Sequence, residues 1–366
     1  MIDRRLVANF NWWYFLLILG VSLLGVLVIY SANHGRPEAF FRNLYLKQIF
    51  WILYGLAALV VAVMIDYALL SRYAYLIYGA TVLALVYVLF YGVIFYGARR
   101  WIHVGPLTLQ VSEFARLALI VALAKYFETG RNAGKYHLKD LLVPAIMTVV
   151  VVLLIAVQPD LGTGMMTAFI FLAFVFAVEL ENRTLIRLCL SGVMVAPALW
   201  FFLRDYQKNR VLTLFNPEMD PLGAGYHAIQ SKIAIGSGGF WGKGLFAGTQ
   251  SRLNFLPEKH TDFIFSVFAE EWGFLGVIVL LTLYLVIILK GLNIAYRASD
   301  RFGLFLALGI VSSISCYAIY NIAMAIGIMP ITGIPLPFLS YGGSALITNF
   351  FAVGLLLNIE MRRTVR

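Results

Sequence analysis

Charged residues are scarce in this chain of 366 residues, where Asp, Glu, Lys and Arg together make up 13%. Soluble globular domains contain about 25% charged residues, so the composition excludes an ordinary soluble protein. Hydrophobic residues instead make up 61% of the chain. Apolar runs of roughly 17 residues or more recur from end to end, which indicates several membrane-spanning helices.

Cysteine and the common catalytic motifs are also scarce. The two cysteines, Cys189 and Cys316, lie in apolar runs, so we expect buried free thiols. The sequence has no HExxH pattern or cysteine cluster for zinc and no nucleophile elbow for a serine hydrolase. The glycine-rich stretch around Lys243 is not a P-loop, because it has Ser237 in place of the first glycine and Gly244 in place of the last Ser or Thr.

The apolar runs predict an all-α integral membrane protein with about ten transmembrane helices, forming a single polytopic domain over residues 1–366. The first run is too long for a signal-peptide core, and we interpret it as a retained signal-anchor. A long loop at about 204–261 separates the seventh and eighth helices. The spans are expected at about 12–30, 48–65, 73–95, 112–128, 141–157, 162–179, 185–203, 272–290, 303–324 and 341–359.

Lys and Arg residues predict the orientation of these spans. Ten spans place both termini on one side, and that side holds fifteen Lys and Arg residues against five in the short loops opposite. By the positive-inside rule both termini are cytoplasmic, and the long loop is extracytoplasmic. The net charge of +10 therefore reports topology, and we expect no nucleic acid partner.

Four ionisable residues are expected at one depth, near the outer ends of the spans. Glu113 and Arg116 have the i, i+3 spacing that lets two side chains of one helix pair. Asp160 lies in a short outer turn, and Asp262 lies at the end of the long loop. Each alone is explained as a snorkelling or capping residue. Together they indicate a polar site in the outer leaflet, because charge near hydrocarbon is costly.

The stretch FLPEKHTDFIF, residues 255–265, leads into the eighth span. We interpret Glu258 and Lys259 as ordinary interfacial charges. Read as a helix, residues 262, 266, 269, 270 and 273 share one face, while Phe263, Val267 and Phe268 turn towards lipid or the bundle. This pattern predicts a short amphipathic lead-in that directs the Asp262 carboxylate at an outer cavity.

Two irregular outer segments leave alternatives open. Residues 327–347 contain three prolines, four glycines and no charge, which is typical of a segment that dips back against the bundle or of an apolar loop covered by its neighbours. The glycines from Gly236 to Gly244 would allow close approach to a ligand or form a flexible hinge.

The outer cations suit a phosphate or pyrophosphate group. A carboxylate at a poorly solvated surface has its pKa raised towards the range of a general base. These residues are therefore compatible with transfer from a lipid-linked pyrophosphate donor, which is one option among several. The expected outer set is Arg100, Arg210, Lys232, Lys243 and Arg252 with Glu113, Asp160 and Asp262.

Long motifs in the right order over essentially the whole chain resemble the SEDS family (shape, elongation, division and sporulation). They resemble most its rod-shape branch, RodA, and the division branch, FtsW, is the nearest alternative. The motifs are YGARRWIHVG, QVSEFARLAL, QPDLGTG, DYQKNRV, DPLGAGYHAIQSKIAIGSGG, GKGLFAGTQSRLNFLPEKHTDFIF, AEEWG and PLPFLSYGGSALI.

The resemblance implies a ten-span peptidoglycan glycosyltransferase that polymerises lipid II at the outer face of the bacterial cytoplasmic membrane. It also implies as partners a class B penicillin-binding protein, which is a transpeptidase, and other membrane proteins of the elongation complex. Asp262 matches the essential aspartate of the family and is the expected general base. Glu113, Asp160 and Arg100 match further site residues, whereas Arg116 replaces a residue that is usually lysine.

No cofactor is firmly implied, and a divalent cation, Mg²⁺ or Mn²⁺, stays an open option. A lipid II transporter is the rival function, and it predicts ionisable groups through the full depth of the spans. A scaffold that only recruits a transpeptidase is the third reading, and it leaves the outer charges without a role.

Overall fold

The computed structural model describes residues 9–34, 38–95, 98–105, 107–130, 135–221, 223–253, 255–256 and 258–363. Some basic residues of the charge count lie outside these ranges, namely Arg4, Arg5, Arg36, Arg131 and Arg366. The side chain of Cys189 is likewise outside the described part. Cys316 is half-buried in a helix and forms no disulfide.

Each of the ten predicted spans has a helix in the structure, which confirms the predicted architecture. Seven helices of the described part are long and apolar enough to cross a membrane, and the chain is a multi-pass membrane protein. The ten helices are α2 (Trp12–Asn33), α4 (Leu44–Met64), α5 (Tyr67–Tyr91), α6 (Val111–Glu128), α7 (Leu142–Val157), α8 (Leu161–Ala177), α9 (Asn182–Phe202), α13 (Ile264–Tyr296), α14 (Arg301–Ala325) and α15 (Gly343–Arg362).

Hydropathy did not reveal the shorter elements. The third span was expected to reach residue 95 but ends at Tyr91, and a three-stranded antiparallel sheet follows it. The long loop between α9 and α13 is largely helical. The elements are α3 (Ala39–Arg42), β1 (Val93–Phe95), β2 (Ala98–Val104), β3 (Leu107–Gln110), η1 (Leu138–Leu141), α10 (Asp205–Phe215), η2 (Pro217–Met219), α11 (Ala224–Ser237) and α12 (Thr249–Arg252).

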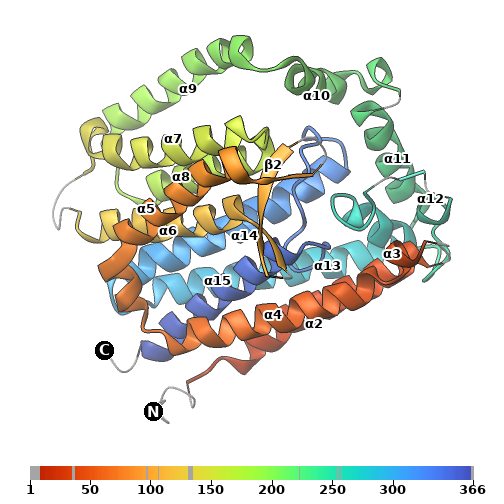
Figure 1. Cartoon of the computed structure of the whole chain (residues 1–366), viewed down its shortest axis with the longest axis horizontal. Coiled ribbons are helices and arrows are strands. Elements are labelled where there is room, and N and C mark those ends of the chain that lie inside the picture. Colours follow the sequence, from red (N-terminus) through yellow and green to blue (C-terminus); the bar gives the residue numbers. More distant parts are fainter. Residues whose placement is uncertain are drawn as a thin grey trace.

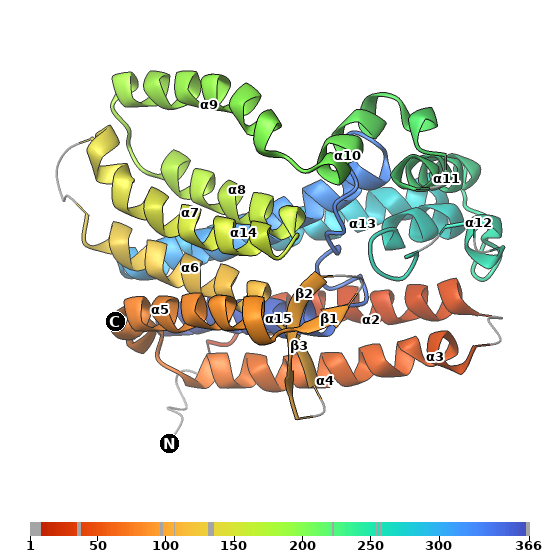
Figure 2. The same cartoon turned by 45° about the horizontal axis from the view of Figure 1, so that its top comes forward.

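Helices α14 and α15 form the centre of the bundle. Helix α15 packs along α4, and α14 packs against α6, α8 and α13. The start of α2 meets the end of α15, where the Asn11 side chain donates to both Glu360 carboxylate oxygens at 3.1 Å. Both ends of the bundle chain therefore lie on one side, as ten spans require. Helices α10, α11 and α12 lie at the far end from the two termini (Figure 1, Figure 2).

The irregular segment between α14 and α15 dips back against the bundle, which is one of the two alternatives that its composition left open. The Leu339 backbone packs on Gly25, in the middle of α2, where a Cβ would lie 2.5 Å from the Leu339 carbonyl oxygen. The Tyr284 hydroxyl of α13 donates to the Pro337 carbonyl, and the Gln48 side chain of α4 donates to the Ser340 carbonyl. Three spans thus hold this segment, which we call the re-entrant segment (residues 326–342).

Helix α13 begins at Ile264, earlier than the predicted start at residue 272, because the amphipathic lead-in is continuous with the span. Every residue from 263 to 271 is buried, so the aromatic face turns to the bundle. The helix breaks at Gly273, where φ is 65°. The loop between α11 and α12 occupies the break: its amides donate to the carbonyls of Glu270 and Glu271, and its carbonyls accept from the amides of Phe274 and Leu275.

Replacing Gly25 by valine should displace the re-entrant segment, because the new side chain overlaps the Leu339 backbone. Overpacking of this kind typically costs about 1–3 kcal/mol, so the thermal midpoint of the purified protein should fall. Gly20→Val is the matched control on the same helix, since nothing lies within 4 Å of a Cβ there. Equal midpoints for the two variants would contradict the packing described.

Candidate functional site

Asp262 is the last residue but one before α13, at the edge of the re-entrant segment. Its amide donates to the Glu258 carbonyl at 3.1 Å, and a Cβ on Gly333 would lie 3.4 Å from its Oδ2. Burial raises the pKa of Asp262 to about 7, and the nearby Glu258 carboxylate adds to this. The Thr261 hydroxyl and the Arg210 guanidinium act in the opposite direction. The result is a carboxyl that gives and takes a proton near neutral pH.

Glu113 and Arg116 form the predicted i, i+3 pair in the first turn of α6. The Arg116 Nη2 to Glu113 Oε2 distance is 2.8 Å, and both side chains are about 4% exposed. Arg116 also donates to Asn349 Oδ1 on α15 at 3.2 Å, and its guanidinium lies 4.2 Å from the centre of the Tyr317 ring. The pair is therefore a neutral unit fixed between α6, α14 and α15.

Asp160 and Arg100 connect the sheet to the turn between α7 and α8. Asp160 caps α8, since its Oδ1 accepts from the Thr163 amide at 3.2 Å, and its Oδ2 accepts from Gln110 Nε2 at 3.0 Å. Arg100 Nη1 lies 3.9 Å from Asp160 Oδ2. The guanidinium also donates to the carbonyls of Gln158 and Pro159. These contacts fix the position of the sheet against the start of α8.

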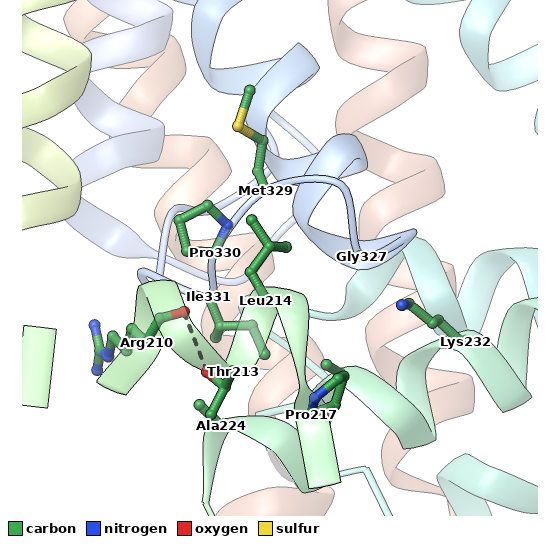
Figure 3. A pocket seen from close by; sticks show the side chains of 11 residues that line it. Arg210, Thr213, Leu214, Pro217, Ala224, Lys232, Gly327, Met329, Pro330 and Ile331 are labelled. Carbon is green, nitrogen blue, oxygen red and sulfur yellow. Dashed lines mark hydrogen bonds between the residues drawn. The ribbon is translucent and has the colours of Figure 1, made fainter. Parts of the chain in front are cut away.

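Arg210 and Lys232 face an open cavity between α10, α11 and the re-entrant segment. One part of this cavity is lined by Tyr206, Asn209, Arg210, Asp220 and His227 and has a volume of about 320 Å³. The adjoining part is lined by both cations and by residues 329–331 of the re-entrant segment. Figure 3 shows Arg210 and Lys232 on opposite sides of the residues that line this part. Two cations in the lining of the cavity suit an anionic ligand.

Asp262 is not among the residues that line the cavity, but it lies near it. Arg210 lines both parts of the cavity and is close enough to Asp262 to lower the pKa of that carboxyl. Ile331 lines the cavity two residues before Gly333, the residue next to the Asp262 carboxylate. An anion bound at Arg210 in the larger part of the cavity would therefore lie near the turn that carries Asp262.

Lys243 lies elsewhere. Its Nζ is 2.7 Å from Glu270 Oε1, and the Glu270 side chain is completely buried. The same carboxylate oxygen accepts from the Thr249 hydroxyl and the Gln250 amide. Lys243 lies in the loop that occupies the break of α13, and it neutralises the buried Glu270 of that helix. It is not among the residues that line the cavity.

Several residues in and around the site were missed or misinterpreted from the sequence. Lys259 was interpreted as an interfacial charge, but it is 1% exposed, so that interpretation was wrong. Tyr317 and Asn321 lie one turn apart on α14, and they connect Arg116 to the backbone of Asp262. Burial lowers the pKa of His227, which lines the cavity. No pattern of hydropathy or charge marks a neutral Asn or Tyr inside a span.

Glu113, Arg116, Asp160 and Asp262 do gather at one end of the bundle, as predicted. Arg210 and Lys232 line the cavity, whereas none of these four residues does. In the described residues, no three His, Cys, Asp or Glu side chains come together as a group that could hold a metal ion.

Comparison with known proteins identifies the family to which the chain belongs. The family model described as "Cell cycle protein", FTSW_RODA_SPOVE, matches residues 11–365. The chain therefore belongs to this family, which is the SEDS family that its motifs resemble.

The branch is the RodA branch. The peptidoglycan glycosyltransferase MrdB of Escherichia coli K12 is 42% identical over 352 residues, which cover 95% of this chain and 92% of the relative. The crystal structure of the rod shape determining protein RodA of Thermus thermophilus has a TM-score of 0.71 at 29% identity, covering 97% of each chain. A chain of a peptidoglycan synthase complex that coordinates polymerization and crosslinking has a TM-score of 0.81 at 33% identity, covering 97% of this chain and 98% of that one.

Replacing Arg116 by methionine should destabilise the protein strongly, because it leaves the buried Glu113 carboxylate without its counter-ion. Breaking a buried pair on one side costs about 3–5 kcal/mol, which thermal unfolding in detergent would measure. The double variant with Glu113→Gln should recover much of this loss. Arg116→Lys, which keeps the charge and loses the fork, should fall between wild type and Arg116→Met. A double variant no more stable than Arg116→Met would contradict the pairing.

Proposed function

We propose that this protein is a peptidoglycan glycosyltransferase that polymerises lipid II into glycan strands at the outer face of the bacterial cytoplasmic membrane during cell elongation. The observation that carries the proposal is Asp262, a carboxyl group whose pKa is raised to about 7 and which lies near a cavity lined by the cationic side chains of Arg210 and Lys232. A general base works best when its pKa lies near the working pH. The family and the named activities of its relatives support the same reaction.

The reaction is a single inverting displacement between two lipid-linked sugars. The Asp262 carboxylate accepts the proton of the acceptor hydroxyl as that oxygen attacks the anomeric carbon of the donor. The bond from this carbon to the pyrophosphate oxygen breaks, and its electron pair leaves with the polyprenyl pyrophosphate. A base on the side of attack and cations on the side of departure lower the barrier together.

Arg210 and Lys232 are the proposed partners of the pyrophosphate. Arginine presents a planar fork of donors to phosphate oxygens, and lysine presents a compact charge. A divalent cation, Mg²⁺ or Mn²⁺, is proposed as an additional counter-charge. Magnesium at phosphate sites is held in part by the phosphate oxygens themselves, so this cation would bind at the pyrophosphate, on the side of departure, and not at Asp262.

The remaining charged residues shape the site. Glu113 and Arg116 are proposed to set the polarity of its floor through their contacts with α14 and α15. Asp160 and Arg100 are proposed to hold the wall made by the sheet and the start of α8. Lys243 is proposed to affect the site only indirectly, by pairing with Glu270 and so fixing the loop at the break of α13.

The chain is proposed to lie with both termini in the cytoplasm, so that Asp262 and the cavity face outward. The charge distribution of the loops supports this orientation. A class B penicillin-binding protein is the proposed partner, together with other membrane proteins of the elongation complex. The structural similarity to a synthase complex that couples polymerization to crosslinking supports a transpeptidase partner.

Asp262→Asn should abolish polymerisation of purified lipid II by the complex with its transpeptidase. In wild type, the rate should rise with pH to about 7 and then level off, because only the deprotonated carboxyl is a base. The variant should fold at least as well: the folded pKa lies above the ordinary 3.8, so ionisation costs stability as the pH rises between these values. Polymerisation by this variant at the wild-type rate would sink the proposal, and lipid II transport without polymerisation would favour a transporter.

Arg210→Gln and Lys232→Gln should each raise the KM for lipid II about ten-fold or more, because a hydrogen bond to a charged group contributes about 1.5–3 kcal/mol. Lys208→Gln is the control, since this lysine is also on α10 but does not line the cavity. Equal effects at all three positions would refute a specific anion site. The same assay in EDTA tests the divalent cation, and full activity there would remove the cation from the proposal.

A further inference from the structure

The turn that carries Asp262 is held by an unusual series of backbone contacts. Three consecutive carbonyl oxygens each accept a hydrogen bond, two from the re-entrant segment and one from α14. His260 O accepts from the Tyr341 amide at 2.9 Å, Thr261 O from the Ser340 hydroxyl at 2.6 Å, and Asp262 O from the Asn321 side chain at 2.9 Å. No helix or sheet ladder supplies these donors.

Asn321 is the central residue of this arrangement. Its side chain is completely buried on α14, and its Nδ2 donates both to Asp262 O and to Ile334 O, the latter at 2.7 Å. One amide thus ties the Asp262 turn to the re-entrant segment. Tyr317 lies one turn earlier on the same helix, under the Arg116 guanidinium.

We propose that Asn321 is a positioning residue, which holds the Asp262 turn against the re-entrant segment so that the carboxylate faces the acceptor hydroxyl. The proposal rests on the role of Asp262 as general base stated above. Asn321 touches no reacting atom in this scheme and acts only through the backbone of the turn. Misplacement of a catalytic group by about 1 Å can cost about a hundred-fold in rate.

The charged groups around Asp262 predict what loosening the turn would do. Glu258 faces it from the same turn, and Arg210 faces it from α10. Helix α14 contributes only the uncharged Asn321, and the re-entrant segment contributes the backbone of Gly333. Burial is the main cause of the raised pKa. Without the Asn321 clamp water gains access to the carboxylate, so its pKa moves down towards the ordinary value.

The test compares Asn321→Leu with Asn358→Leu in lipid II polymerisation by the complete complex. Asn358 is a matched control, because it is buried on α15 and also donates to backbone carbonyls, those of Ala62, Val63 and Ile65, far from the site. Asn321→Leu should lower kcat about 10- to 100-fold per folded protein, change KM less, and move the acid limb of the rate profile to lower pH. Asn358→Leu should lower thermal stability and leave the pH profile unchanged.

A second variant keeps the test decisive if Asn321→Leu folds poorly. Asn321→Asp has nearly the same shape, but it adds a carboxylate beside the turn. The acid limb should then move to higher pH, opposite to the change in Asn321→Leu, because a nearby like charge disfavours ionisation of Asp262.

Unchanged acid limbs in the Asn321 variants, with losses that only follow the amount of folded protein, would show a purely structural role and overturn the inference. The outcome for Asp262→Asn distinguishes failure of the proposed function from failure of the positioning role. If that variant is fully active, the proposed function fails. If it is inactive while the Asn321 variants keep the wild-type pH profile, only the positioning role fails.

Discussion

One requirement shapes the end of this bundle opposite the chain termini: each carbonyl oxygen buried there needs a donor, since neither lipid nor the packed interior supplies water. The turn before α13 obtains its donors from the elements packed against it. The turn before α13 presents three carbonyls, and the re-entrant segment and α14 supply the three donors. The position of Asp262 depends on these hydrogen bonds, because the turn that needs the donors is the turn that carries Asp262.

Two carboxylates, Glu113 and Asp262, differ in how closely a positive charge neutralises them. Glu113 has a full counter-charge at 2.8 Å, so the pair is neutral and fits deep in the bundle. In the described residues Asp262 forms no salt bridge, and the Thr261 hydroxyl and the Arg210 guanidinium offset its charge in part. Glu113 is fixed in an ion pair inside the bundle, whereas a carboxyl that is poorly solvated and weakly compensated gains basicity. This contrast supports a structural role for Glu113 and the proposed proton transfer by Asp262.

Much of the architecture could be predicted from the sequence, because hydropathy reports burial in lipid directly. The ten spans and the Glu113–Arg116 pair depend only on composition and on the period of a helix. The three-stranded sheet could not be predicted, since strands of three to seven residues leave no periodic signal beside a long apolar run. Lys259 was misread because its burial depends on tertiary packing that charge alone does not report.

The candidate site was predictable in part for the same reason. Asp262 was identified because a carboxylate next to an apolar run is rare. The grouping of Arg210 with Lys232, and the separation of Lys243 from them, depends on how α10, α11 and the loop before α12 fold over one another. Asn321 is neutral and lies in an apolar helix, so only its two hydrogen bonds reveal it.

The break of α13 at Gly273 links the surface to the interior. Inside an unbroken helix, the amides of Phe274 and Leu275 would find their acceptors one turn back; here their acceptors are carbonyls of Gly239 and Phe240 in the loop between α11 and α12. The loop in turn takes its own acceptors from the helix. Displacing this loop would therefore leave four backbone hydrogen bonds of a membrane-crossing helix unmade, so the continuity of α13 depends on a segment more than 20 residues earlier in the chain.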